Sequence, residues 1–352
     1  MLQPSSAFMS RARPRAVANW LFVVAAMIVA IVIVGGITRL TESGLSITEW
    51  KPIRGIIPPI GLAQWQAEFD AYKRIPEYAQ MNSGMTLPGF KTIYFWEYFH
   101  RLLARTIGLA FALPLLWFWV RGRIPAGYGP RLVALLLLGG LQGVIGWWMV
   151  ASGLSVRTDV SHVRLAAHLM TALVTLAGIV WTALDLRTLA RDPLATQARL
   201  DRVAVVAFAL LFVQLVYGAF TAGLNAGYAF ASWPLMGDAL FPAGVPMTDP
   251  TWANAVDNPI VVQFVHRWLA FVTAAGLVWL AARAVRAGSP RAGMAVILLV
   301  GLQISLGVAT LMTGVAIPVA VAHQANAALL LIATVWAAHV VGQRGAVLEP
   351  AR

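Results

Sequence analysis

The sequence predicts an all-α integral membrane protein with eight transmembrane helices. Of its 352 residues, 59% are hydrophobic and only 11% are charged, whereas soluble domains carry about 25% charged residues. Apolar runs of about 20 residues, the length that crosses a bilayer as a helix, recur along the chain. Because these runs are continuous rather than alternating, they favour helices over a transmembrane barrel.

The eight expected spans follow one another along the chain. They cover residues 18–38, 93–119, 132–152, 161–184, 203–223, 259–282, 292–313 and 318–342. The first apolar run is too long for a signal peptide, so we interpret it as a retained span. The long loop 39–92 carries Trp65, Phe69 and Tyr72 at helical spacing. This stripe predicts an amphipathic helix lying at the outer membrane interface.

The distribution of basic residues predicts the topology. Arginine concentrates in segments 120–131, 185–202 and 283–291, whereas segment 224–258 has neither Lys nor Arg. The positive-inside rule therefore places the arginine-rich segments and both termini in the cytoplasm. Loop 39–92 contains basic residues, but long loops are translocated largely regardless of charge. The net charge of +12 thus reflects topology, and no nucleic-acid partner is expected.

The sequence predicts two four-helix bundles related as a parallel repeat, which cover residues 1–190 and 191–352. Spans one to four are echoed by spans five to eight in the same orientation, because four is an even number of crossings. The matching polar features are His100-Arg101 with His266-Arg267, His168 with His323, and Leu141-Gln142-Gly143 followed by Gly146 with Leu302-Gln303-Ile304 followed by Gly307.

Four histidines fall inside spans two, four, six and eight: His100, His168, His266 and His323. Each lies roughly 8–11 Å below the expected start of its helix. Histidine is costly inside a membrane, and a neutral imidazole is a good axial ligand for haem iron held between two helices. A core histidine, or a zinc or copper site, is the alternative, but such metals usually take three or four clustered ligands. No cysteine is present to supply a thiolate ligand. Two pairs, one in each half, favour two haems.

Glu97 breaks the symmetry of the repeat. It lies three residues before His100 and shares its helix face, whereas the second half has Gln263 at the matching position. A partly desolvated carboxylate is suited to proton transfer. The first half is therefore the expected reacting site and the second an electron-transfer site. The alternative is that Glu97 only complements the positive N-terminal end of its helix.

The remaining polar residues near these histidines are more ambiguous. Arg101 and Arg267 each follow a histidine and match haem propionates chemically. They could equally anchor the helices or pair with Glu97 or another acid. His162 and His339 lie near helix ends, so we expect them to be interfacial rather than ligands.

The sequence resembles the haem A synthase family from about residue 17 to residue 342. The most specific stretches are Gly35 to Ser46, Glu49-Trp50-Lys51-Pro52, Phe90-Lys91-Thr92-Ile93, Trp96-Glu97-Tyr98-Phe99-His100-Arg101, Ala226-Gly227, Trp233-Pro234-Leu235-Met236, His266-Arg267 and His323-Gln324. Lacking cysteine, the chain is similar to the cysteine-free class of proteobacteria and mitochondria.

The resemblance implies oxidation of the C8 methyl of haem O to a formyl group, giving haem A for terminal oxidases. It implies that His100 and His168 bracket the substrate haem, that His266 and His323 ligate a permanent haem b, and that Glu97 is the catalytic glutamate. A bis-histidine di-haem electron-transfer protein is the alternative function.

The resemblance also bears on location and partners. It favours a bacterial inner membrane with the haem sites toward the periplasm. Pathway logic makes a haem O synthase a candidate partner for substrate delivery. The electron acceptor, the oxygen source and any homo-oligomeric state are left open.

Overall fold

The computed structural model describes residues 11–50 and 54–348, which contain eight helices long and apolar enough to cross a membrane. They are α2 (Pro14–Leu40), α5 (Leu87–Val120), α6 (Gly129–Ala151), α7 (His162–Leu189), α8 (Arg202–Gly223), α10 (Pro259–Arg286), α11 (Pro290–Met312) and α12 (Ile317–Leu348). Each corresponds to one expected span, so the all-α membrane fold is confirmed. Lys51 and Pro52, part of one family-like stretch, lie outside the described residues.

Local chemistry explains several helix starts. Proline occupies the first turn of α2, α5, α6, α10 and α11, where its missing N–H costs nothing. Asp201 begins α8 by accepting a 2.8 Å hydrogen bond from the backbone N–H of Val203. Asn258 begins α10 in the same way, through the N–H of Ile260. These caps satisfy backbone donors that the first turn leaves free.

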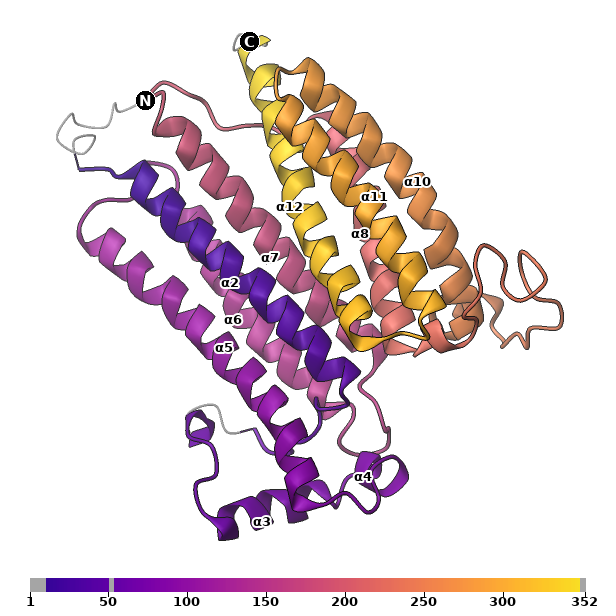
Figure 1. Ribbon diagram of the computed structural model, residues 1–352. Coiled ribbons are helices and arrows are strands. Elements are labelled where there is room, and N and C mark those ends of the chain that lie inside the picture. The colour runs from indigo at the N-terminus through magenta and orange to yellow at the C-terminus, as the bar shows by residue number, and fades with distance from the viewer. Residues whose placement is uncertain (1–10, 51–53, 349–352) are drawn as a thin grey trace.

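The helices contact one another as two rings of four (Figure 1). In the first ring, α2 packs on α5 and α7, and α6 packs on the same two helices. In the second ring, α10 packs on α8 and α11, and α12 packs on the same two. Contacts of α7 with α8, and of α12 with α2 and α7, join the rings. A duplicated four-helix unit would produce this order of contacts; the division into two halves near residue 190 stays a prediction.

Burial separates inner helices from outer ones. In the most apolar windows of α7 and α12, 56% and 67% of the residues are buried, against 6% and 11% in α6 and α11. The inner helices therefore pack on protein along most of their surface. The apolar surfaces of α6 and α11 are left to face lipid, where they need no protein partner.

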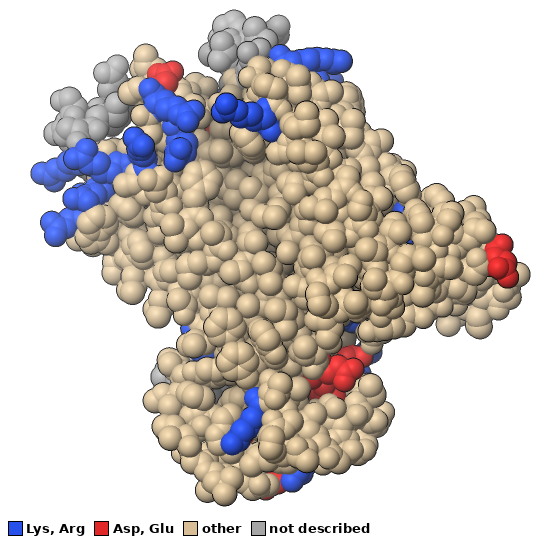
Figure 2. All heavy atoms as spheres, in the orientation of Figure 1, with Lys and Arg blue, Asp and Glu red and all other residues tan. Residues whose placement is uncertain are grey.

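The charged residues gather at the ends of the helices. The start of α2 and the end of α12 lie at the same end of the bundle, called here the terminal end (Figure 1). Most of the Lys and Arg side chains visible in Figure 2 also lie there, separated by a broad uncharged band from the opposite end. This is the pattern of a membrane protein whose terminal end faces the cytoplasm, an orientation that stays a prediction.

The loop after α2 forms an ordered cap on the opposite end of the bundle. It contains η1 (Arg54–Ile56), α3 (Leu62–Tyr72) and α4 (Pro76–Gln80), so the predicted helix is confirmed. Its apolar stripe packs against the first turns of α5: the ring centroids of Phe69 and Tyr72 lie 4.9 and 5.4 Å from that of Phe90. Both residues are buried by protein, so the stripe does not face the membrane interface as expected.

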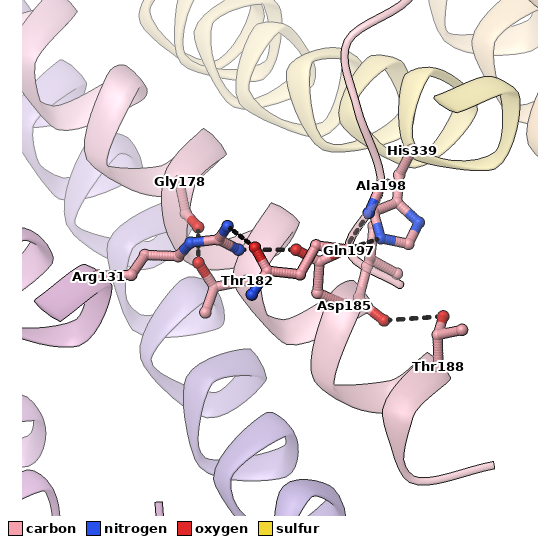
Figure 3. Close-up of polar contacts among 9 residues, drawn as sticks. Arg131, Gly178, Thr182, Asp185, Thr188, Gln197, Ala198 and His339 are labelled. Atoms are coloured by element: carbon pink, nitrogen blue, oxygen red, sulfur yellow. Dashed lines mark hydrogen bonds and ion pairs between the residues drawn. The ribbon is translucent and has the colours of Figure 1, made fainter. Parts of the chain in front are cut away.

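A polar network joins the two rings at the terminal end (Figure 3). Asp185 on α7 accepts a 2.7 Å bond from Arg131 on α6 and a 3.0 Å bond from the backbone N–H of Ala198. Its other contact is His339 Nε2 on α12, at 2.9 Å. Both Asp185 and His339 are buried. The interfacial reading of His339 was therefore wrong, because the ring is enclosed between helices and paired with a carboxylate.

The three short elements between α8 and α10 form a second cap. They are η2 (Ala226–Tyr228), η3 (Thr251–Ala253) and α9 (Asn254–Asp257). Asn254 is buried and binds the backbone of Thr248 through both amide atoms. This segment therefore has internal order despite its length.

Candidate functional site

Each of the four membrane histidines rests against a glycine of the preceding span. A Cβ atom added to these glycines would lie 2.8–3.1 Å from Cε1 of the facing imidazole. The pairs are Gly35 with His100, Gly146 with His168, Gly218 with His266, and Gly307 with His323. Every one of these glycines lies five residues before the end of its helix. The four imidazoles therefore lie at one level, about 7–8 Å from the helix ends opposite the termini.

The histidines form two pairs, one in each ring of helices. His100 and His168 lie close enough for a charge on one to act on the other, and so do His266 and His323. Among residues 11–50 and 54–348, no group of three or more His, Asp or Glu side chains is placed to hold a metal ion. The arrangement suits two planar groups, each ligated from both faces, better than a compact metal centre.

The start of α5 changes one expectation about depth. The helix begins at Leu87 rather than near residue 93, so His100 lies further from the helix start than predicted. The additional turns project beyond the bundle and pack on α3 (Figure 1). Depth in the bundle is thus set by the facing glycine, not by the number of residues from the start of the helix.

Two observations test whether these residues fit a haem. The Nδ1 atom of His100 is buried and has no hydrogen-bond partner among the described residues. Each imidazole also abuts a glycine where a side chain would collide with it, so the glycines keep room for the rings. Paired imidazoles flanked by glycine fit axial ligation of haem iron.

Glu97 lies at the centre of a polar network one turn from His100. Its Oε2 accepts 2.7 Å bonds from the Ser46 hydroxyl and from the backbone N–H of Ile47. Its Oε1 accepts a 2.6 Å bond from Arg101 Nη2, which also donates to the Ile47 carbonyl at 3.0 Å. Glu97 is 3% exposed. Of the two roles left open for Arg101, the structure shows the pairing with Glu97.

The second half repeats this network with different chemistry. Gln263 donates from Nε2 to the Phe230 carbonyl at 3.1 Å. Arg267 donates to the carbonyls of Phe230 and Ser232, both at 2.8 Å. In each half the residue pair on the helix therefore holds the preceding outer loop in place. Glu97 differs from Gln263 in carrying a negative charge, in addition to sharing its structural role.

Other residues of the family-like stretches join the two rings rather than contacting the histidines. Gln324, next to His323, lies against Gly36 and donates to the Val32 carbonyl at 2.7 Å. Arg39 donates to Asn225 Oδ1 at 2.8 Å, in the loop after α8. These contacts tie α2 to α12 and to the second outer cap.

His162 was expected to be interfacial, and the structure corrects this. It is 5% exposed, and its Nε2 lies 3.1 Å from Asp257 Oδ1 at the end of α9. It therefore links α7 to the second outer cap and is not placed with either histidine pair. Sequence reasoning also missed Ser46 and Ile47, which nothing in their residue types identifies as partners of a carboxylate 50 residues away.

The chain is similar to known proteins along almost its whole length. The family model described as Cytochrome oxidase assembly protein, COX15-CtaA, matches residues 18–335. A "Heme A synthase" of Rhizorhabdus wittichii is 60% identical over 327 residues, covering 93% of this chain and 94% of the relative. A "Heme A synthase" of Sphingopyxis alaskensis is 52% identical over 348 residues, covering 99% of this chain and 98% of the relative. The chain is therefore a multi-pass membrane protein that belongs to the COX15-CtaA cytochrome oxidase assembly family.

Proposed function

We propose that this chain is a haem A synthase, which oxidises the C8 methyl of haem O to a formyl group and so supplies haem A to terminal oxidases. The observation that carries the proposal is a pair of facing histidines with a buried carboxylate, Glu97, one turn away on the same helix. The names of the relatives, all similar over nearly the full chain, support the same activity.

The two histidine pairs have different proposed tasks. His100 and His168 would ligate the iron of the substrate haem O, because Glu97 lies in their half. His266 and His323 would ligate a resident haem b. When bound, that haem b supplies one-electron transfer between the reacting site and an outside acceptor. The chain itself provides ligands, orientation and electrostatics.

Glu97 is the proposed proton-handling residue. Both of its oxygens are held by hydrogen bonds, so the carboxylate has a fixed position beside the first pair. Among its partners, only the Ser46 hydroxyl can both donate and accept a proton. As the methyl group is oxidised, its electrons would leave toward the outside acceptor, and a released proton would reach Glu97 and exchange through Ser46 toward the outer cap. A hydroxymethyl haem would be the expected intermediate between haem O and haem A.

The proposed setting is the bacterial inner membrane, with both haem sites toward the periplasm. The level of the four glycines near the helix ends opposite the arginine-rich end supports this orientation. A haem O synthase in the same membrane remains the proposed source of substrate. Electron transfer without haem modification, the alternative function, accounts for the histidine pairs. It does not account for the charge at Glu97, and the relatives' names do not support it.

Two Glu97 variants test the proposal. Gln263 shows that an amide at this position can hold an outer loop in this fold. Glu97→Gln should therefore keep the chain folded and haem b bound while abolishing haem A formation, and Glu97→Ala should do the same with a less stable cap. The measurement is pigment extraction and mass analysis after co-expression with a haem O source. Normal haem A in Glu97→Gln would refute the proton-handling role, and no haem A from the unmodified chain would refute the function.

A further inference from the structure

Three of the four membrane histidines are held by a glutamine of the preceding span. Gln142 Nε2 lies 3.1 Å from Nδ1 and 3.3 Å from Nε2 of His168, and 2.9 Å from the His168 carbonyl oxygen. Gln214 Nε2 lies 3.1 Å from His266 Nδ1 and 3.0 Å from the His266 carbonyl oxygen. In both cases one amide contacts the imidazole and the backbone of the same residue. The ring is therefore fixed relative to its own helix.

The third glutamine is held in turn by a second amide. Gln303 Nε2 lies 3.3 Å from Nδ1 and 3.4 Å from Nε2 of His323. These nearly equal distances place the amide against the ring rather than in line with one nitrogen. Asn326, one turn after His323 on α12, donates to Gln303 Oε1 at 2.7 Å and to the Leu299 carbonyl at 3.0 Å. The orientation of the Gln303 amide is thus set independently of the histidine.

All three glutamines occupy the same register. Each lies four residues before the glycine that faces the same imidazole: Gln142 with Gly146, Gln214 with Gly218, and Gln303 with Gly307. Residues four apart lie on one helix face, one turn apart. Each of these rings therefore contacts a glycine backbone at one level and an amide one turn below it. We call this arrangement the Gln–Gly cradle.

His100 is the exception. It has the glycine, Gly35, but the residue four positions earlier on α2 is Ile31, which carries no polar group. The Nδ1 atom of His100 is accordingly buried without a hydrogen-bond partner among the described residues. Ile31, by contrast with the three glutamines, offers the His100 ring neither a donor nor an acceptor.

We propose that Gln142, Gln214 and Gln303 are positioning residues for three axial imidazoles. We propose also that His100, which lacks such a residue, is the axial ligand that detaches from the haem iron most readily. Groups packed around a metal-bound imidazole set its rotation and its strength as a ligand. In the second half an amide holds each of the two rings, which suits a permanent haem with both ligands fixed. In the first half an amide holds only one of the two rings, which suits a haem that must enter, react and leave. The inference rests on the haem-binding roles proposed above.

The test uses the full-length protein purified with its haems after co-expression with a haem O source. Two variants, Gln214→Leu and Gln303→Leu, remove a positioning amide, and Ile31→Gln supplies the missing one. Ser305→Ala is the matched control, since Ser305 lies on the same helix as Gln303 and its hydroxyl bonds only within that helix, to Gly301. The readouts are haem content, the low-spin electron paramagnetic resonance signals, and carbon monoxide bound per haem after reduction by dithionite.

Removal of either amide should leave haem b bound but shift its low-spin signal and raise carbon monoxide binding. Ile31→Gln should lower carbon monoxide binding about fivefold at the first site, the effect expected of one added hydrogen bond. Ser305→Ala should match the unmodified protein. Unchanged signals and carbon monoxide binding in the glutamine variants, or undiminished binding in Ile31→Gln, would overturn this inference alone. An unmodified protein that binds no haem would overturn the proposed function and this inference together.

Discussion

Arg101 Nη2 donates a 2.6 Å hydrogen bond to Glu97 Oε1, one turn earlier on the same helix. The side chains are 16% and 4% exposed, so the ion pair is largely removed from water. Arg101 also bonds the Ile47 carbonyl, and Ile47 donates its N–H to Glu97. The pair therefore holds the outer loop at the same place where it holds the proposed catalytic carboxylate.

Arg101→Ala should accordingly lower stability more than a surface substitution would. Removing one partner of a buried ion pair leaves the other charge uncompensated, at a cost of about 3–5 kcal/mol. We expect a lower melting temperature in detergent and faster proteolysis of the loop before α3. Lys73→Ala is a suitable control, because Lys73 forms an exposed ion pair with Asp70 worth about 0–1 kcal/mol. Equal melting temperatures for the two variants would argue against a structural role for Arg101.

Glu77 predicts a pH dependence of the outer cap. Burial raises the pKa of Glu77 from its ordinary 4.5 to about 8, with smaller contributions from Glu42, Glu97 and Asp159. Its Oε2 has no hydrogen-bond partner among the described residues. Between these two pKa values the folded chain keeps a proton that the unfolded chain releases. The free energy of unfolding should therefore fall as the pH rises from about 4.5 to about 8.

Glu77→Gln should remove most of this dependence, because the amide stays neutral at every pH. Melting temperatures measured in detergent from pH 5 to pH 9 would show the difference between the two proteins. Glu68→Gln provides a control in the same loop, since Glu68 is only partly buried whereas Glu77 is buried. If the melting temperature of Glu77→Gln fell with rising pH as much as that of the unmodified protein, another titrating group would be responsible for the effect.

Hydropathy was sufficient to predict the eight helices, because membrane spans must satisfy their own backbone hydrogen bonds and need long apolar runs. The positions of the four candidate ligand histidines could also be predicted, since polar residues stand out in apolar segments. The partners of these residues could not. Asp185 and His339 are 154 positions apart, and only the packing of α7 against α12 brings them together. The helix at α3 was predicted, but its apolar stripe was expected at the membrane interface and instead packs on α5. An apolar helix face does not reveal whether lipid or protein covers it.

The role of the glutamines could be predicted from the sequence only in part. Gln142 and Gln303 were visible as a match between the halves, but the match alone assigned them no task. The spacing of Gln and Gly by four residues in three separate spans was the available signal. Its meaning depends on knowing that each glycine faces an imidazole, which requires the helix contacts.

The network around Asp185 predicts a loss of stability that leaves the proposed haem sites intact. Asp185→Ala would leave Arg131 and His339 without their buried carboxylate, at a cost of about 3–5 kcal/mol. Asp185 lies 17 residues beyond His168 on α7, a distance of about 25 Å along the helix. Purified protein should therefore melt at a lower temperature but bind the same haem per chain. Asp192→Ala, at an exposed carboxylate in the same segment, should change neither property.

The glycines beside the histidines provide the most local prediction. A Cβ atom at Gly146 would lie 2.8 Å from Cε1 of His168, closer than real side chains approach one another, whereas Gly143 on the same helix has nothing within 4 Å. Gly146→Ala should therefore push the imidazole from its position, and Gly143→Ala should not. Both substitutions raise intrinsic helix propensity by the same amount, so they differ only in this contact. We expect Gly146→Ala to lose haem O, and with it haem A, while haem b in the second half keeps its spectrum. Equal haem O binding by the two variants would show that His168 has no fixed position in the site.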